Sequence, residues 1–492
     1  MSGIKKLAGQ TLWYGVSNVA GRFLNYLLTF LHVSLFKSAE YGDVSIFYAN
    51  AALLSIFFTY GMETAYFRFV QQNDSRKVYS TSFISLLVST VFLSAIIILF
   101  REPIAVFMKT PNNPEWITWL TLIIAADTLA ALPFALLRQQ NRPKKYAFIK
   151  LANIFLTIGL QIFFFWVYPR WFGKPADIGF VFLSNLIASA ATILLLGKEL
   201  TLIDWKFDSS LWKKMIPYAL PLIIVGFGGM VNETIDRQLL LRLYDGTIQE
   251  TKSAIGIYSA NYKLAILIVL FIQAFRMGAE PFFFQQAGKE NAQKTYARVM
   301  KFFVIACCFC FLFIVMFLSD WKNLISFKFP EYAQGIAVVP LLALAKIFLG
   351  IYYNLSIWYK LKDKNLTGAW ITLGGAAITV AFNWIFIPIL GYMACAIATI
   401  LCYGFMMVVS YTLGQKHYPI PYAWKKLLAY IVICLLLFGL HQAFLLIGLN
   451  PWINRGVAVI FIGLFTLLVL NVERKEFERM PFIGKFLKPR IV

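Results

Sequence analysis

The chain has 492 residues, of which 60% are hydrophobic and 14% are charged, whereas a soluble protein has roughly 45–50% apolar and about 25% charged residues. This composition excludes a soluble enzyme. The 45 Lys and Arg against 23 Asp and Glu would suggest a nucleic-acid partner in a soluble chain, but a membrane protein gathers such cations in its cytoplasmic loops. We therefore expect an all-α polytopic membrane protein and no nucleic-acid partner.

Stretches of about 20 apolar residues, which is the length that crosses about 30 Å of hydrocarbon, occur about fourteen times along the chain. We predict transmembrane helices over 8–35, 44–67, 79–100, 115–137, 147–168, 177–197, 216–241, 254–280, 299–318, 333–358, 367–388, 391–413, 426–448 and 453–472. The first is too long for the core of a signal peptide, so we expect it to be retained. The connections are too short to fold as separate domains.

The distribution of cations predicts the orientation. If the N-terminus is cytoplasmic, 30 of the 45 Lys and Arg residues fall in the inner connections, ten in the outer connections and five inside spans. Lysine and arginine are enriched on the cytoplasmic side of membrane proteins. The sequence therefore predicts cytoplasmic termini and an even number of spans.

An internal repeat of about 210 to 220 residues, which is the length of six spans, is indicated by recurring motifs. Tyr41 and Gly42 lie near the start of span two, and Gly256 and Tyr258 near the start of span eight. Six spans return the chain to the same side, so the two copies should be parallel lobes related by an axis along the membrane normal. We expect an N-lobe over 1–205, a C-lobe over 206–415, and two extra helices with a basic tail over 416–492.

Ionisable residues inside the predicted spans are few, and each one needs a partner, water or a ligand, because a charge at mid-membrane costs roughly 2.5–3.5 kcal/mol. Most of them lie in spans one, two, seven and eight, which occupy equivalent places in the two copies. These four helices should therefore face a central cavity. The residues are Arg22, Arg237, Lys263, Arg276, Lys346, Glu63, Asp127, Glu233, Asp236 and Glu280.

Span one carries a single polar stripe, because its polar residues recur at steps of four and three. They are Asn18, Arg22, Asn25, Thr29 and His32. The arginine lies near mid-depth. A guanidinium is always charged and its fork matches phosphate oxygens, so this stripe favours a large amphiphile with a phosphate group as the substrate.

Spans seven and eight leave alternatives open. Lys263 and Arg276 are thirteen residues apart, about 220° around a helix, so they share one cavity only if the helix bends or the cavity is broad. Glu233 and Arg237 are four residues apart, so a purely structural pair is the alternative to a role in transport. Pro217 in span seven permits a kink.

Short motifs at the starts and ends of spans two, seven and eight carry a family resemblance. They are Pro217, Tyr218, Leu220 and Pro221, then Asp236 with Arg237, Gly256 with Tyr258, Tyr41 with Gly42, and Gly61 with Ala65 and Arg68. In these motifs the chain resembles the polysaccharide-exporter (Wzx-type) branch of the multidrug/oligosaccharidyl-lipid/polysaccharide (MOP) exporter superfamily. The resemblance implies a MATE-like fold, a bacterial cytoplasmic membrane and a flippase that moves undecaprenyl-diphosphate-linked oligosaccharide by alternating access.

The expected site follows from the stripes and the resemblance together. Carried over from the family, the cationic cavity is formed by Arg22, Lys263 and Arg276. The substrate-binding set that we expect is Arg22, Asn18, Asn25, Lys263, Arg276 and Arg237. The candidates for binding a coupling ion, a proton or sodium, are Glu63, Asp127 and Glu233. Membrane lipid, a polysaccharide polymerase and glycosyltransferases of the same pathway are the expected partners.

Two other functions compete with this reading. A multidrug/cation antiporter of the same superfamily predicts a cavity of net negative charge. A membrane glycosyltransferase or ligase would need larger loops than this chain has. Only three histidines and no HExxH or Walker motif are present, so we expect neither a metal site nor a cofactor, and a secondary transporter rather than an enzyme.

Overall fold

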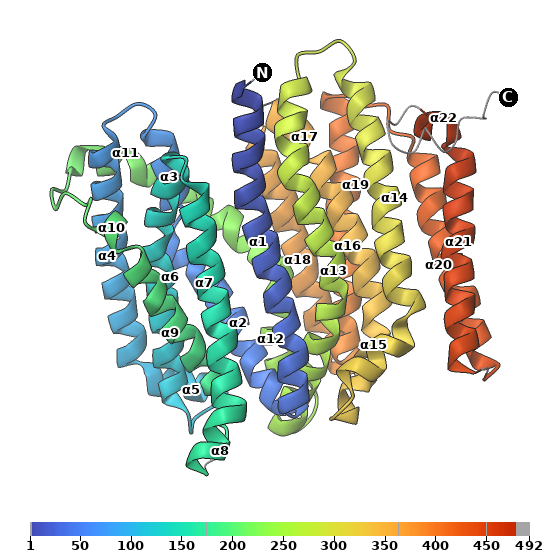
Figure 1. Cartoon of the computed structure of the whole chain (residues 1–492), viewed down its shortest axis with the longest axis horizontal. Helices are drawn as coiled ribbons and strands as arrows, with labels where there is room; N and C mark the ends of the chain where they lie inside the picture. The colour runs from blue at the N-terminus through green and yellow to red at the C-terminus, as the bar shows by residue number, and fades with distance from the viewer. Residues whose placement is uncertain (1, 174, 363, 449, 479–492) are drawn as a thin grey trace.

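A computed structural model describes the chain apart from residues 1, 174, 363, 449 and 479–492, and it describes side chains from residue 19 onward. The described residues form helices that run side by side, and they contain no strand (Figure 1). The helix α1 begins at the same end of the molecule at which α21 finishes (Figure 1). We call this end the terminal end and the other the distal end.

The first lobe contains the helices of predicted spans one to six. They are α1 (Ser2–Leu35), α2 (Ser38–Thr59), α3 (Met62–Phe69), α4 (Ser75–Leu99), α5 (Arg101–Phe107), α6 (Pro114–Gln139), α7 (Pro143–Ile162), the π-helix η1 (Phe163–Val167), α8 (Tyr168–Phe172), α9 (Phe180–Leu195) and α10 (Gly197–Leu200).

The helices of predicted spans seven to twelve follow, forming the second lobe from α12 onward, and a final helix pair comes after them. They are α11 (Ser209–Ala219), α12 (Pro221–Leu243), α13 (Ile248–Gln286), α14 (Ala292–Met316), α15 (Leu318–Ile325), the 3-10 helix η2 (Pro330–Ala337), α16 (Val338–Leu355), α17 (Ile357–Leu361), α18 (Asn365–Leu390), α19 (Tyr392–His417), α20 (Trp424–Leu446), α21 (Pro451–Val472) and α22 (Arg474–Phe477).

The predicted membrane spans are confirmed as helices, and their number is approximately right. Twelve helices of the described chain are long and apolar enough to cross a membrane. The other two predicted spans correspond to shorter apolar helices, Val19–Leu35 within α1 and α9. The fold is therefore all-α and multi-spanning, as the composition predicts.

Two helices are interrupted beside each other at the boundary between the lobes. Span two breaks between α2 and α3, where Tyr60 and Gly61 have φ angles of 32° and 72°. Span seven breaks at Leu220, just before Pro221. A Cβ on Gly61 would lie 2.7 Å from the carbonyl oxygen of Ala219, so the absence of a side chain lets the two breaks pack together.

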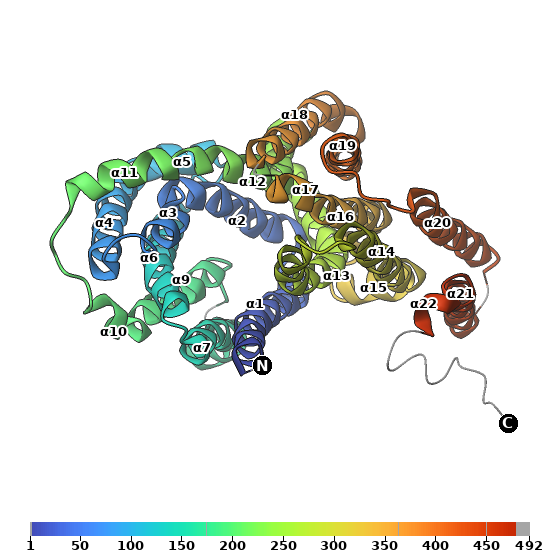
Figure 2. The same cartoon turned by 90° about the horizontal axis from the view of Figure 1, so that it is seen from above.

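The first half of span seven packs against the first lobe rather than the second. Buried Leu211, Met215 and Ala219 of α11 join a core cluster with Tyr66 and Tyr79 of α3 and α4. The helix α11 lies alongside the first lobe in Figure 2. The chain thus changes lobe at the kink after α11, and the predicted boundaries near residues 205 and 415 stay a prediction.

The two lobes meet closely at the distal end, where α2 crosses α13. A Cβ on Gly42 would overlap the carbonyl oxygen of Lys252, and a Cβ on Gly256 would overlap that of Ser38. Both glycines are required for the same reason: only glycine lets the two backbones approach this closely.

Polar contacts between the lobes surround this crossing. Lys252 forms a salt bridge of 2.8 Å with Asp43, and the hydroxyls of Ser38 and Ser253 lie 2.7 Å apart. Glu331 of η2 accepts a hydrogen bond of 3.2 Å from the backbone N–H of Ser38 at the start of α2. The distal end is therefore held closed by contacts from both lobes.

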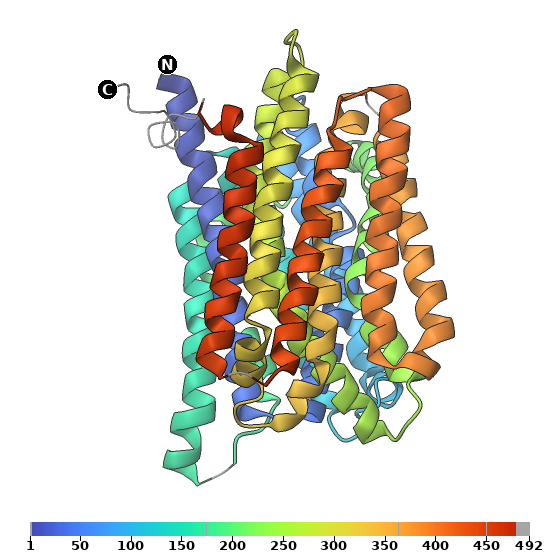
Figure 3. The ribbon, with the colours of Figure 1, turned by 90° about the vertical axis from the view of Figure 1, so that its right-hand side faces the viewer.

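The pair α20 and α21 lies at the edge of the second lobe, beside α14 (Figures 2 and 3). Glu473, which follows α21, is 3% exposed. Its carboxylate accepts hydrogen bonds from Lys301, Lys426 and Tyr430, of which Lys301 comes from α14. This buried acid anchors the pair to the lobe at the terminal end.

Candidate functional site

A cavity of about 440 Å³ lies between the lobes. Side chains from α1, α2, α7, α9, α12 and α13 line it. Most of its polar side chains are neutral amides and hydroxyls. They are Asn25, Thr29, Tyr41, Ser45, Tyr48, Asn153, Thr157, Gln161, Asn185, Thr234, Ser259 and Tyr262. We call this cavity the central chamber.

The polar stripe of span one faces the central chamber over part of its length. Asn25, Thr29 and His32 line the chamber, whereas Arg22 lies one turn nearer the terminal end and outside the lining. The imidazole Nε2 of His32 is 2.8 Å from the amide oxygen of Gln161. Asn18, the remaining member of the stripe, lies outside the residues whose side chains are described.

Arg276 and Arg22 form a second cationic region near the terminal end. The guanidinium of Arg276 stacks over the ring of Tyr353 at 3.9 Å and lies 3.4 Å from Glu280. Lys360 also pairs with this carboxylate. The guanidinium of Arg22 interacts electrostatically with Tyr353, Arg276 and Glu233. Within the described residues Arg22 has no salt bridge, so the region has an excess of positive charge.

Lys263 lies apart from these arginines. It lines the central chamber, and the residues that interact with its charge are His32 and Arg237. Thirteen residues of α13, about 20 Å of helix, separate it from Arg276. The helix does not bring the two cations into one cavity: Arg276 is absent from the chamber lining. The described chain therefore holds cations at two depths.

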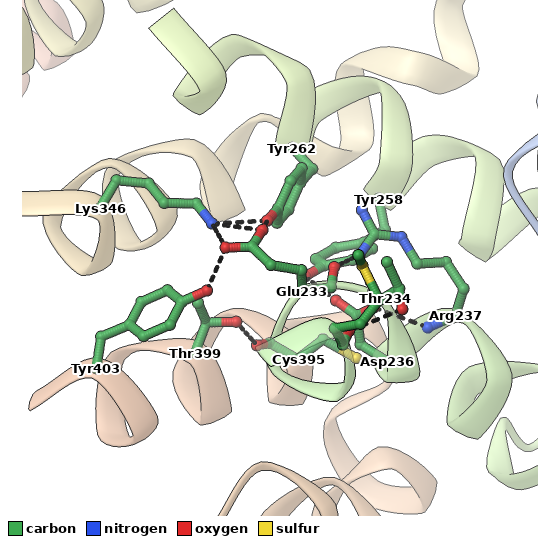
Figure 4. Close-up of polar contacts among 11 residues, drawn as sticks. Glu233, Thr234, Asp236, Arg237, Tyr258, Tyr262, Lys346, Cys395, Thr399 and Tyr403 are labelled. Carbon is green, nitrogen blue, oxygen red and sulfur yellow. Dashed lines mark hydrogen bonds and ion pairs between the residues drawn. The ribbon is translucent and has the colours of Figure 1, made fainter. Parts of the chain in front are cut away.

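Glu233 faces the chamber but is tied into the second lobe (Figure 4). Its carboxylate accepts hydrogen bonds of 2.6 Å from the hydroxyls of Tyr262 and Tyr403, and it forms a salt bridge of 3.1 Å with Lys346. The side chain of Lys346 is 0% exposed, whereas that of Glu233 is 37% exposed. One buried ammonium thus neutralises the carboxylate from behind.

The structural pair of Glu233 with Arg237, four residues apart, is a wrong alternative. Arg237 forms its salt bridge with the adjacent Asp236 at 2.6 Å, and donates only to the backbone oxygen of Glu233. The other oxygen of Asp236 accepts from Tyr258 at 2.6 Å. Helical spacing allowed the predicted pair, but a buried lysine from another helix provides Glu233 with a better partner. Arg237 lines the chamber with its charge already compensated.

A separate cavity of about 320 Å³ lies within the first lobe. Asp127, at the middle of α6, faces it and accepts a hydrogen bond of 2.9 Å from the hydroxyl of Ser189. Lys150 also faces it, with its ammonium 4.2 Å from the centre of the Phe134 ring. Glu63 lines the cavity as well, but Arg138 pairs with it. We call this the first-lobe cavity.

Sequence reasoning missed the contribution of α7 and α9 to both cavities. Spans five and six contain no mid-membrane charge, so they were not expected to face the interior. Asn153 and Asn185 nevertheless line both the central chamber and the first-lobe cavity. The signal was present as amides in otherwise apolar helices, since an amide in hydrocarbon also requires a polar partner.

Comparison with known proteins decides the family. The sequence profile described as "polysaccharide biosynthesis protein" matches residues 7–287, more than half of the chain. The chain belongs to the polysaccharide biosynthesis protein family. No curated protein sequence matches it significantly.

The fold of this family member is similar to that of MOP-superfamily transporters. The lipid II flippase MurJ, in an inward closed conformation, aligns with a TM-score of 0.71 and 12% identity over 93% of this chain and 98% of that chain. A MATE multidrug transporter in an inward-facing conformation aligns with a TM-score of 0.64 and 14% identity over 82% and 94%. The expected MATE-like architecture is confirmed.

Proposed function

We propose that the protein is a flippase that carries an undecaprenyl-diphosphate-linked oligosaccharide across the bacterial cytoplasmic membrane by alternating access. The observation that carries the proposal is the arrangement of Arg22 and Arg276 beside a polar chamber whose lining consists mostly of neutral side chains. Within the described residues Arg22 has no salt bridge, and Arg276 shares Glu280 with Lys360. Two guanidiniums can bind a diphosphate, while the amides and hydroxyls of the chamber can bind sugar hydroxyls.

The orientation follows from the cation count. The predicted topology assigns 30 Lys and Arg residues to the connections on the side of the N-terminus and ten to the opposite side, so the terminal end faces the cytoplasm in this proposal. The distal end, closed by the crossing of Gly42 and Gly256, then faces outward. The lipid-linked substrate would enter from the inner leaflet and place its diphosphate at the arginines.

Energy for transport would come from a coupling ion or from the membrane potential, which is worth about 2.3 kcal/mol per charge per 100 mV. Of the three carboxylates expected to bind a proton or sodium, Glu63 and Glu233 are held in salt bridges. Asp127 has a serine hydroxyl as its hydrogen-bond partner and faces a cavity. We therefore favour Asp127 as the coupling residue.

The multidrug antiporter remains the competing proposal, because MATE transporters share the fold. An organic cation would require a cavity of net negative charge. The ionised groups on the chamber wall are Glu233, Arg237 and Lys263, and the first two are compensated by Lys346 and Asp236. The uncompensated charge is that of Lys263, which is positive and disfavours a cationic drug.

The structurally similar proteins are transporters, which favours a non-enzymatic function over a ligase or a glycosyltransferase.

Reconstitution tests this proposal. Purified protein in liposomes should move a fluorescent undecaprenyl-diphosphate glycan between leaflets, and Arg22→Ala and Arg276→Ala should each slow this by about 10-fold to 100-fold, the value of a lost charged hydrogen bond. Lys294→Met, which removes an exposed cation from α14, is the matched control. Normal transport by both arginine variants would refute the diphosphate assignment.

A further inference from the structure

Two neighbouring groups on the wall of the central chamber lack partners. The hydroxyl of Ser259 is buried and has no hydrogen-bond partner within the described residues. Lys263 has neither a salt bridge nor a hydrogen bond there, and it lines the same chamber. Since they are four residues apart on α13, both side chains lie on one face of the helix.

A buried hydroxyl without a partner is unfavourable, and an ammonium in the middle of a membrane without a partner is more unfavourable still. Elsewhere in the second lobe, Lys346 and Arg237 each form a salt bridge with a carboxylate. The Ser259 and Lys263 pair is therefore left for a ligand that brings an anionic oxygen.

We propose that Ser259 and Lys263 form a carboxylate site that selects oligosaccharides carrying an acidic sugar, such as a uronic acid. This inference rests on the proposed function and specifies its substrate class. One carboxylate oxygen would accept from the Lys263 ammonium and the other from the Ser259 hydroxyl. The surrounding amides and hydroxyls, Asn25, Thr29 and Gln161 among them, match the neutral hydroxyls of the same sugar.

The position of the site distinguishes a sugar carboxylate from the diphosphate. Lys263 lies about 20 Å along α13 from Arg276, so a diphosphate held by Arg276 and Arg22 leaves Lys263 for a group several sugar units away. The charged residue of α12 that interacts with Lys263 is Arg237, which Asp236 already neutralises. The deep chamber thus recognises the glycan, and the arginines recognise the lipid diphosphate.

Binding of water-soluble glycans to the purified full-length protein tests the site without the lipid. The probes are a radiolabelled trisaccharide ending in glucuronate and the same trisaccharide ending in glucose. Wild type should bind the acidic probe about 10-fold to 100-fold more tightly, which is the range expected for a charged hydrogen bond. Lys263→Met should abolish the preference, Ser259→Ala should weaken it, and Lys263→Arg should retain it. Equal binding of both probes by wild type would overturn the proposal.

Binding measurements with the bare lipid separate this inference from the proposed function. Bare undecaprenyl diphosphate should bind Lys263→Met as tightly as wild type, and should bind Arg276→Ala at least 10-fold more weakly. If Lys263→Met weakens binding of the bare lipid as much as binding of the acidic glycan, Lys263 binds phosphate and the proposed carboxylate site is wrong. If no variant affects the bare lipid but the glycan preference is present, the diphosphate assignment fails and the carboxylate site stands. Thermal unfolding checks that each variant is folded.

Discussion

Two acidic residues inside the lobes, Glu233 in the second lobe and Asp127 in the first, have opposite surroundings. In the second lobe, Glu233 is neutralised by Lys346, and Asp236 by Arg237. In the first lobe, Asp127 faces a cavity of about 320 Å³ and has no salt bridge within the described residues. The comparison teaches that a charge in a span does not by itself mark a moving part. Its partners and the space around it decide whether it is structural or free to bind an ion.

The largest expected effect comes from unpairing the second lobe. Lys346→Met leaves the carboxylate of Glu233, whose side chain is 37% exposed, without its cation. Breaking a fully buried salt bridge from one side typically destabilises by about 3–5 kcal/mol, and the loss here should be smaller because the carboxylate left behind is partly exposed. We expect a clear drop in the thermal unfolding temperature in detergent. The double variant Lys346→Met with Glu233→Gln should recover most of the loss, because no uncompensated charge remains. Unchanged stability of the single variant would mean that the second lobe is not held by this pair.

At the crossing between the lobes, Gly42 and Gly256 each face a backbone carbonyl of the other lobe, so matched substitutions should have matched effects. Gly42→Ala and Gly256→Ala each place a methyl group against a backbone carbonyl of the other lobe. Overpacking costs typically about 1–3 kcal/mol, and here it destabilises the conformation in which the distal end is closed. A cysteine pair at Ser38 and Ser253, whose hydroxyls lie 2.7 Å apart, should cross-link less readily in both alanine variants. Efficient cross-linking in either variant would contradict the close approach.

A substitution at Asp127 in the first lobe should reduce transport with little loss of stability, which is the reverse of what we expect for Lys346→Met. Asp127→Asn keeps the hydrogen bond from Ser189 but cannot take up a proton or bind sodium as a carboxylate does. We expect transport to fall by about tenfold and to lose its dependence on the ion gradient, while stability changes by less than about 1 kcal/mol. Transport in liposomes with imposed proton or sodium gradients measures this. Gradient-dependent transport by the variant would remove Asp127 as the coupling residue.

The smallest effect is expected for Glu63→Gln. The side chains of Arg138 and Glu63 are 34% and 40% exposed, and salt bridges with such access to solvent contribute about 0–1 kcal/mol. Stability and transport should both stay close to wild type. A loss of transport as large as that of Asp127→Asn would make Glu63 part of the coupling site and would extend the first-lobe site toward the terminal end.

Sequence reasoning located the charged residues well but paired them poorly. Helical spacing left a pair of Glu233 with Arg237 open as an alternative, whereas the lobe pairs Glu233 with Lys346, which is 113 positions away. Depth along α13 was predictable from residue count, so the separation of Lys263 from Arg276 could be stated in advance as an alternative. The sequence could not show which of the two lines the chamber, because that depends on how α13 is rotated against its neighbouring helices.

The sequence by itself determined the all-α multi-spanning architecture, the approximate span limits, the recurring motifs at Gly42 and Gly256, and the family resemblance. These features follow from local transfer free energies and short motifs, which are properties of consecutive residues. Only the tertiary structure decided that the two glycines contact the opposite lobe, that α11 packs on the first lobe, and that amides of α7 and α9 line the chamber. Such contacts depend on packing between helices distant in sequence, and local hydropathy holds no information about that packing.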